Sequence, residues 1–77
     1  MKLNEFVKYV DSGVLRIRYT KSGIQTQFDI GIGTIQNWWI CSALRKYERV
    51  QNWKIVSIKA ISQDAIEIKI KEGKNDL

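Results

Sequence analysis

Apolar residues recur along this chain with two different periods, and each period predicts one type of element. The first segment carries apolar side chains at the spacing of one helical face: Leu3, Phe6, Val7 and Val10. This spacing predicts a helix over about residues 3–11. Gly13 follows as the expected C-terminal stop, because glycine accepts the left-handed conformation in which many helices end.

Strict alternation of apolar and polar residues then predicts a β-hairpin. The segments "VLRIRYT" (residues 14–20) and "IQTQFDIGI" (residues 24–32) flank the short turn "KSG". The side chains expected on one face of these strands are Leu15, Ile17, Tyr19, Ile24, Thr26, Phe28, Ile30 and Ile32. Gly31 and Gly33 predict a bulge or bend where the second strand leaves the sheet.

A helical period returns after Asn37, a residue type that caps helix N-termini. The apolar positions with this spacing are Ile40, Ala43, Leu44 and Tyr47. Basic residues follow near the C-terminal end, where the helix dipole favours positive charge: Arg45, Lys46 and Arg49. The pattern predicts a short middle helix.

Two further alternating segments, "WKIVSIKAI" and "AIEIKIK", predict a closing hairpin joined by "SQD". In its first strand we expect Val56, Ile58 and Ala60 on the buried face. In the second strand Ile66, Ile68 and Ile70 alternate with Glu67, Lys69 and Lys71.

The predicted order of elements is helix, hairpin, helix, hairpin, which is typical of the α+β class. We expect a small antiparallel sheet of about four strands, with the N-terminal helix and the short middle helix packed on one face. Residues 1–71 are assigned to this single domain, and residues 72–77 to a polar tail that frays. A domain of 77 residues buries only about 60% of the surface of its unfolded chain. One cysteine and no histidine leave neither a disulfide nor an ordinary zinc ligand set, so apolar packing must stabilise the fold.

Four segments of the chain resemble a group of short proteins encoded by phages and integrated mobile elements of Gram-positive bacteria. They are "LNEFVKYVDSG", "VLRIRY", "IGIGTI" and "VQNWKIVSIKAISQDAIEIKI". The shared pattern is a helix, an acidic residue before a turn, two strands, a variable middle and a closing "V-x-x-I … D-x-I-x-I" hairpin. The resemblance implies a mobile-element origin, and small proteins of that origin often inhibit or redirect host proteins, including CRISPR effectors and other defence nucleases. The group has no assigned chemistry, so no functional residue is carried over.

Composition argues against an enzyme. Without histidine the chain lacks the usual general base near neutral pH, and Cys41 lacks the histidine partner of a cysteine nucleophile. We expect Cys41 to be a buried packing thiol. The glycines of "GIGT" lack the lysine and spacing of a phosphate-binding loop. We therefore predict a non-enzymatic protein that uses no cofactor and no metal.

The N-terminal residues do not resemble a signal peptide, and no apolar run reaches the roughly 20 residues that span a bilayer. A single unpaired cysteine fits a reducing compartment. These features predict a cytoplasmic protein with no membrane partner.

A formal net charge of +5 favours contact with phosphate, which makes a sequence-nonspecific nucleic-acid-binding protein the alternative function. The residues expected to bind in that case are Arg16, Arg18, Lys69 and Lys71. Tyr19 and Phe28 point away from the arginine face, which argues against a base-stacking platform. The competing interpretation is a solvated face on which the arginines pair with Asp29 and Glu67.

The three tryptophans suggest a protein-binding surface next to the core. Trp38 and Trp39 would point about 100° apart on a helix, so both cannot face the sheet. We expect Trp39 and Trp53 in the core. For Trp38, both a place in the core and a place at an interface fit the pattern. The predicted protein-binding residues are Trp38, Arg45, Lys46, Tyr47 and Arg49. Tryptophan, tyrosine and arginine are the residues enriched at interface hot spots.

Our principal functional prediction is a binding protein that inhibits or modulates a host enzyme through protein–protein contact. A third interpretation is a homodimer formed by edge pairing, since the predicted edge strands contain no proline.

Overall fold

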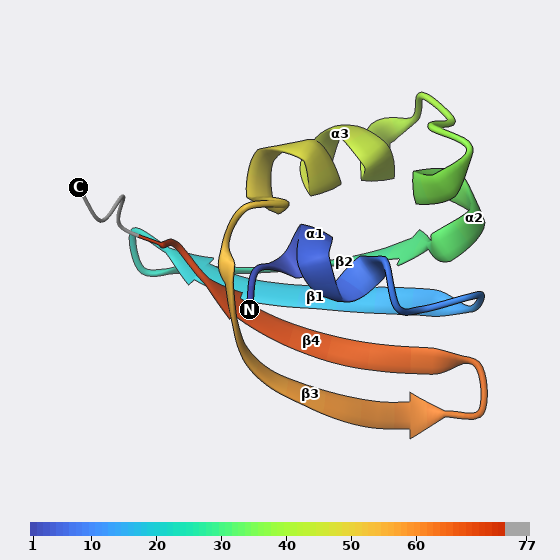
Figure 1. The fold of residues 1–77 in the computed structure, drawn as a ribbon. Coiled ribbons are helices and arrows are strands. Elements are labelled where there is room, and N and C mark those ends of the chain that lie inside the picture. The colour runs from blue at the N-terminus through green and yellow to red at the C-terminus, as the bar shows by residue number, and fades with distance from the viewer. Residues whose placement is uncertain (74–77) are drawn as a thin grey trace.

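A computed structural model, which describes residues 1–73, places three helices over one face of a four-stranded sheet (Figure 1). The elements in chain order are α1 (Leu3–Val7), β1 (Val14–Lys21), β2 (Ile24–Gly31), α2 (Ile32–Gln36), α3 (Ser42–Val50), β3 (Lys54–Ser62) and β4 (Ala65–Lys71). The α+β class is confirmed, with its four strands, N-terminal helix and middle helix. The predicted tail falls mainly on residues 74–77, which lie outside the described residues.

The strand order is β2-β1-β4-β3, so the two predicted hairpins lie side by side. Pairing within each hairpin is antiparallel, as expected. The central pair differs, because β1 and β4 run parallel, with Ile17 beside Ile68. The expected all-antiparallel sheet is therefore wrong at its centre. The chain crosses from β2 at one edge to β3 at the other, and such a crossover is what a parallel pair requires.

The buried side chains form one cluster between the sheet and the helices. Its members are Leu3, Val7, Leu15, Ile17, Phe28, Ile30, Ile32, Leu44, Tyr47, Val50, Ile68 and Ile70. Trp53, which was predicted in the core, is partly buried and packs against this cluster, edge-to-face on Tyr19 with 4.9 Å between ring centroids. The first hairpin's predicted apolar face is confirmed except near the turn, where Ile24 is exposed.

The helices begin and end at different residues from those expected. Helix α1 ends at Val7 instead of residue 11, and Gly13 lies beyond it, just before β1, with φ +108°. Strand β2 runs directly into α2, where a simple bend was expected, and Gly31 is the N-cap. Asn37, the expected N-cap of the middle helix, is instead the C-cap of α2. Helix α3 starts only at Ser42.

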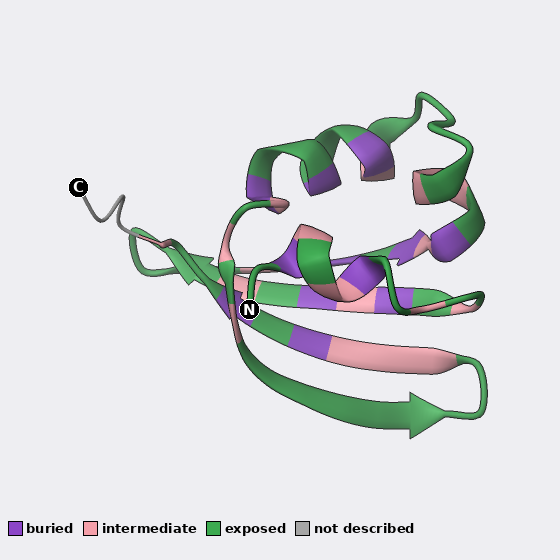
Figure 2. Ribbon diagram, in the orientation of Figure 1, coloured by how far each residue is buried: buried purple, intermediate pink, exposed green. Residues whose placement is uncertain are grey.

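Strand β3 is the least covered strand of the sheet (Figure 2). Val56, Ile58 and Ala60, which were expected to be buried, are all exposed. Ile58 does lie opposite buried Ile68, as its face was predicted. The prediction failed because α2 and α3 pack against β2 at the far edge and leave β3 without a covering layer. Within residues 1–73, no helix has the length and apolar character needed to cross a membrane.

Gly13 provides a test of how the two hairpins meet. A Cβ at this position would lie 2.6 Å from the backbone oxygen of Asp64, the same oxygen that accepts the Val14 N–H at 2.8 Å. We expect Gly13→Ala to lower the free energy of unfolding by roughly 2–4 kcal/mol, from the clash and the positive φ together. Gly23→Ala is the control, because φ there is +77° with no neighbouring atom within 4 Å. It should cost only about 1 kcal/mol in urea unfolding. Equal losses for the two variants would contradict the close approach at Gly13.

Candidate protein-binding surface

The connection between α2 and α3 exposes three large apolar side chains in succession. Trp38 is 50% exposed, Trp39 65% and Ile40 74%. We call residues 37–41 the tryptophan loop. Trp39 was predicted in the core and Ile40 on the buried face of the middle helix, and both predictions are wrong, because these residues precede α3. A cluster of exposed large apolar residues on so small a protein is informative, whereas a single one is not.

The backbone of the tryptophan loop is held by a Schellman motif at the end of α2. Trp38 N–H donates to the Ile35 carbonyl at 3.2 Å, and Trp39 N–H donates to the Thr34 carbonyl at 3.0 Å. Trp38 therefore occupies the left-handed position of this motif, with φ +52°. Glycine usually occupies that position, since a side chain there is strained by about 1–2 kcal/mol. The chain keeps a tryptophan where its backbone favours glycine.

Helix α3 places the predicted basic residues on its outer side. Its buried face is made by Leu44, Tyr47 and Val50. Arg45, Lys46 and Arg49 are exposed and line a shallow hollow together with Ile40, Cys41 and Ser42. We call this hollow, with its six lining residues, the basic hollow. Lys46 also reaches back over the ring of Phe28, with 6.0 Å from Nζ to the ring centroid.

Cys41 is exposed rather than buried, which corrects the expected packing role. Its Sγ accepts a hydrogen bond from the Leu44 N–H at 3.4 Å and so caps the N-terminus of α3. The thiol thus takes the capping role that the sequence suggested for Asn37.

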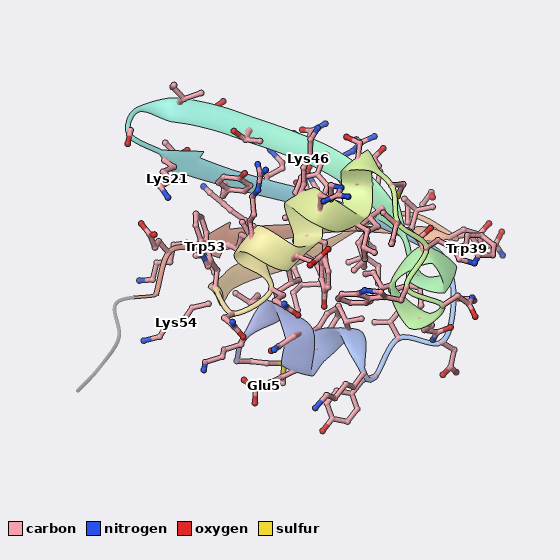
Figure 3. The ribbon with its side chains drawn as sticks, turned by 90° about the horizontal axis from the view of Figure 1, so that it is seen from above. Glu5, Lys21, Trp39, Lys46, Trp53 and Lys54 are labelled. Atoms are coloured by element: carbon pink, nitrogen blue, oxygen red, sulfur yellow. The ribbon has the colours of Figure 1, made fainter. Side chains whose placement is uncertain are left out.

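Trp38 faces a second hollow, on the other side of α3. This groove between α1 and the two later helices is lined by Asn4, Val7, Lys8, Ile35, Gln36, Trp38, Tyr47 and Gln51. Of the five predicted binding residues, Trp38 and Tyr47 line this groove and the three cations line the basic hollow, so the five do not form one patch. Trp39 lies at the far end of the molecule, away from Lys46 and Trp53 (Figure 3). The tryptophan loop passes between the two hollows and contributes Trp38 to one and Ile40 to the other.

Tyr47, one of the predicted binding residues, belongs to the core. It is 3% exposed, and burial raises the pKa of its phenol above the usual value. Only part of its side chain lines the groove beside Trp38. Its predicted role at the surface is therefore corrected to a packing role.

The alternative surface lies on the open face of the sheet, opposite the helices. Arg16 Nε lies 3.1 Å from Asp29 Oδ1, and Arg18 Nη1 lies 3.4 Å from Glu67 Oε1. The hydrogen bond and the charge of Asp29 raise the pKa of Arg16. These contacts confirm the interpretation of a solvated face with paired arginines.

The two lysines of the alternative set lie on β4 in the same sheet. Lys69 is beside Arg18 in the register, and Lys71 is opposite Lys54. Phe28 is buried on the other face and Tyr19 packs against Trp53, so neither ring is available beside the arginines. Two of the four predicted cations thus already have acidic partners.

Within residues 1–73, no three cysteine or acidic side chains are grouped closely enough to hold a metal ion. Comparisons of the chain with known protein families, curated proteins and solved structures find no match.

The strain at Trp38 can be measured by comparing two small replacements. Both Trp38→Gly and Trp38→Ala remove the indole, but only glycine relaxes the positive φ. We expect the glycine variant to be the more stable of the two by about 1 kcal/mol in urea unfolding. Trp39 is the control position, because its φ is not positive. There alanine should be at least as stable as glycine. A Trp38→Ala variant that is as stable as Trp38→Gly would contradict the left-handed conformation.

The buried phenol of Tyr47 predicts a loss of stability in alkali. In the unfolded chain a tyrosine deprotonates near pH 10, while the folded protein holds the Tyr47 proton to a higher pH. The folded state then binds more protons, so its free energy of unfolding falls as pH rises above about 10. We expect Tyr47→Phe to lose less stability than the wild type between pH 8 and pH 11 in urea unfolding. Tyr9→Phe, at a 78% exposed ring, is the control. An identical loss in the wild type and Tyr47→Phe would contradict this.

Proposed function

We propose that this chain is a non-enzymatic binding protein that acts by protein–protein contact through the tryptophan loop and the basic hollow. The observation that carries the proposal is the run of exposed Trp38, Trp39 and Ile40 immediately before a helix that exposes three cations. Because these three side chains stay in contact with water, the folded chain does not gain the stabilisation that their burial would give. A partner that covers them removes apolar area from water, at about 25 cal/mol per Å² before the costs of association.

The composition of the surface supports a protein partner with apolar and acidic groups. Tryptophan and arginine are the residues most enriched at binding hot spots, where a ring fills a pocket and charges surround it. Arg45 and Arg49 offer guanidinium forks that bind carboxylates with two hydrogen bonds. The strained backbone at Trp38 supports the same proposal, since strain tends to persist at functional sites.

A nucleic-acid-binding function is the second candidate and rests on the formal net charge of +5. The open sheet face offers it less support, because Arg16 and Arg18 contact Asp29 and Glu67. Single-strand binding also relies on aromatic rings interleaved with cations, and the rings near that face are packed elsewhere. The exposed tryptophan rings lie at the tryptophan loop instead.

The resemblance of the apolar spacing to small mobile-element proteins supports a narrower version of the proposal. In it, the chain is encoded by a phage or mobile element, works in the cytoplasm, and inhibits or modulates a host enzyme. A defence nuclease such as a CRISPR effector is the partner class we propose. A small protein of net charge +5 would dock on an acidic part of such an enzyme.

A site-specific cross-link tests whether the tryptophan loop touches a protein. We expect a photoreactive residue at Ile40 to cross-link a host protein in bacterial cells, while the same residue at Ile24 does not. Ile24 is the control because it is also strongly exposed but lies at the β1–β2 turn. A nuclease of a defence system as the captured protein supports the narrower proposal, and an unrelated protein contradicts it.

Single substitutions then measure the contribution of the surface to affinity for the captured protein. Trp39→Ala should weaken binding roughly thirtyfold, the size of a hot-spot contribution, and leave the folded state intact. Ile24→Ala should leave the affinity unchanged. Titration of labelled single- and double-stranded DNA and RNA across a salt series tests the second candidate. Tight, steeply salt-dependent binding that falls on Arg16→Gln would favour nucleic acid over a protein partner.

A further inference from the structure

The outer edge of β3 is free over most of its length. Strand β3 ends the sheet, and within residues 1–73 only the N-terminal segment pairs with its outer side. Lys2 bridges Lys54, and the Ile55 N–H donates to the Met1 carbonyl at 2.9 Å. Beyond Ile55, no strand in the described part of the chain lies beside the outer backbone groups. A free strand edge of this kind is a template for pairing with another chain.

The two faces of this edge differ in chemistry. On the helix side, Ile58 and Ala60 lie opposite Ile68 and Ile66 of β4, and Ile58 is 49% exposed. On the open side, Lys59 lies opposite Glu67, and Ser57 lies opposite Lys69. Glu67 is already bonded to Arg18. Within the described part of the chain, neither Lys59 nor Lys69 has an ion-pair partner.

We propose that the outer edge of β3 binds an extended segment of a partner protein in which apolar and acidic side chains alternate. Such a segment adds a fifth strand whose backbone pairs with β3, the mode of recognition known as strand addition. Its apolar side chains lie beside Ile58 and cover part of the exposed apolar strip. Its carboxylates lie beside Lys59 on the other face, because successive side chains of a strand alternate between faces.

The positive charge of the domain favours an acidic partner segment over a second copy of the chain at this edge. Two copies paired through β3 bring two domains of net charge +5 together. They also set the lysines of one open face beside those of the other, and like charges across strands are destabilising. An acidic strand meets the opposite sign at the same positions.

The length of the pairing is limited by the shape of β3. Its register with β4 shifts between Ile55 and Ser57 and again between Ala60 and Ser62. Bulges of this kind interrupt regular pairing. The regular stretch is therefore Ser57–Ala60, which favours a short, weak contact over continued edge-to-edge assembly.

A peptide titration followed by NMR tests the proposal on the intact, ¹⁵N-labelled chain. The probe is a ten-residue capped peptide of alternating valine and glutamate. We expect it to shift the amide resonances of residues 56–61 and to slow hydrogen exchange there. The matching peptide of alternating valine and lysine should bind at least tenfold more weakly.

Charge reversal on each side of the molecule gives the matched variants. Lys59→Glu should weaken the glutamate peptide roughly five- to tenfold, because it replaces an attraction by a repulsion. Lys46→Glu makes the same change in net charge on α3 and should leave the affinity within about twofold. Trp39→Ala should also leave the affinity for the glutamate peptide unchanged, so the test of the β3 edge is independent of the proposed function of the tryptophan loop.

Three outcomes overturn the proposal. Amide shifts at α3 instead of β3 would assign the peptide to the basic hollow. If Lys46→Glu and Lys59→Glu weakened the affinity for the glutamate peptide equally, the affinity would depend on net charge alone and not on the β3 edge. Sedimentation that shows a dimer without peptide, together with broadening of the β3 amides, would assign the edge to a second copy.

Discussion

The parallel pairing of β1 with β4 is the interaction on which this fold depends. Each hairpin alone would be a two-stranded ribbon, and such ribbons are marginally stable in water. Their junction sets buried Ile17 beside buried Ile68 and makes a sheet wide enough to carry a core. Gly13 serves the junction, because the carbonyl of Asp64 that accepts the Val14 N–H leaves no space for a side chain.

This topology also places the candidate surfaces. With β2 and β3 at opposite edges, the chain must cross the whole sheet between them, and that crossing contains α2, the tryptophan loop and α3. The two helices pack where the crossing begins, against β2. As a result the tryptophan loop and the outer edge of β3 are left without a covering layer. Both expose apolar side chains next to cations, a combination that suits a partner with apolar and acidic groups.

In the tryptophan loop, two residues differ from those that the local backbone conformation favours. A Schellman turn favours glycine at its left-handed residue, and this chain has Trp38 there. A cysteine caps α3, although serine, threonine, asparagine and aspartate are the common choices. In contrast, the open sheet face follows ordinary rules, with arginines and acids paired across neighbouring strands. Departure from local rules at one place supports the tryptophan loop over the sheet face as the binding surface.

The hydrophobic pattern was sufficient to predict both hairpins and, within α3, the buried positions Leu44 and Tyr47. It offered the pairing of Arg16 and Arg18 with acids as one of two interpretations. Alternation shows which side chains share a face, and this information is local. Whether another element covers that face depends on how the helices and strands pack together. Ile58 lies on the predicted face yet is exposed, because β3 is an edge strand. Trp39 is exposed because α2 ends at Gln36 and the chain then turns at left-handed Trp38. The parallel pairing of β1 with β4 could not be predicted either. Strand order depends on contacts between residues some 50 positions apart, and a local pattern carries no information about such contacts.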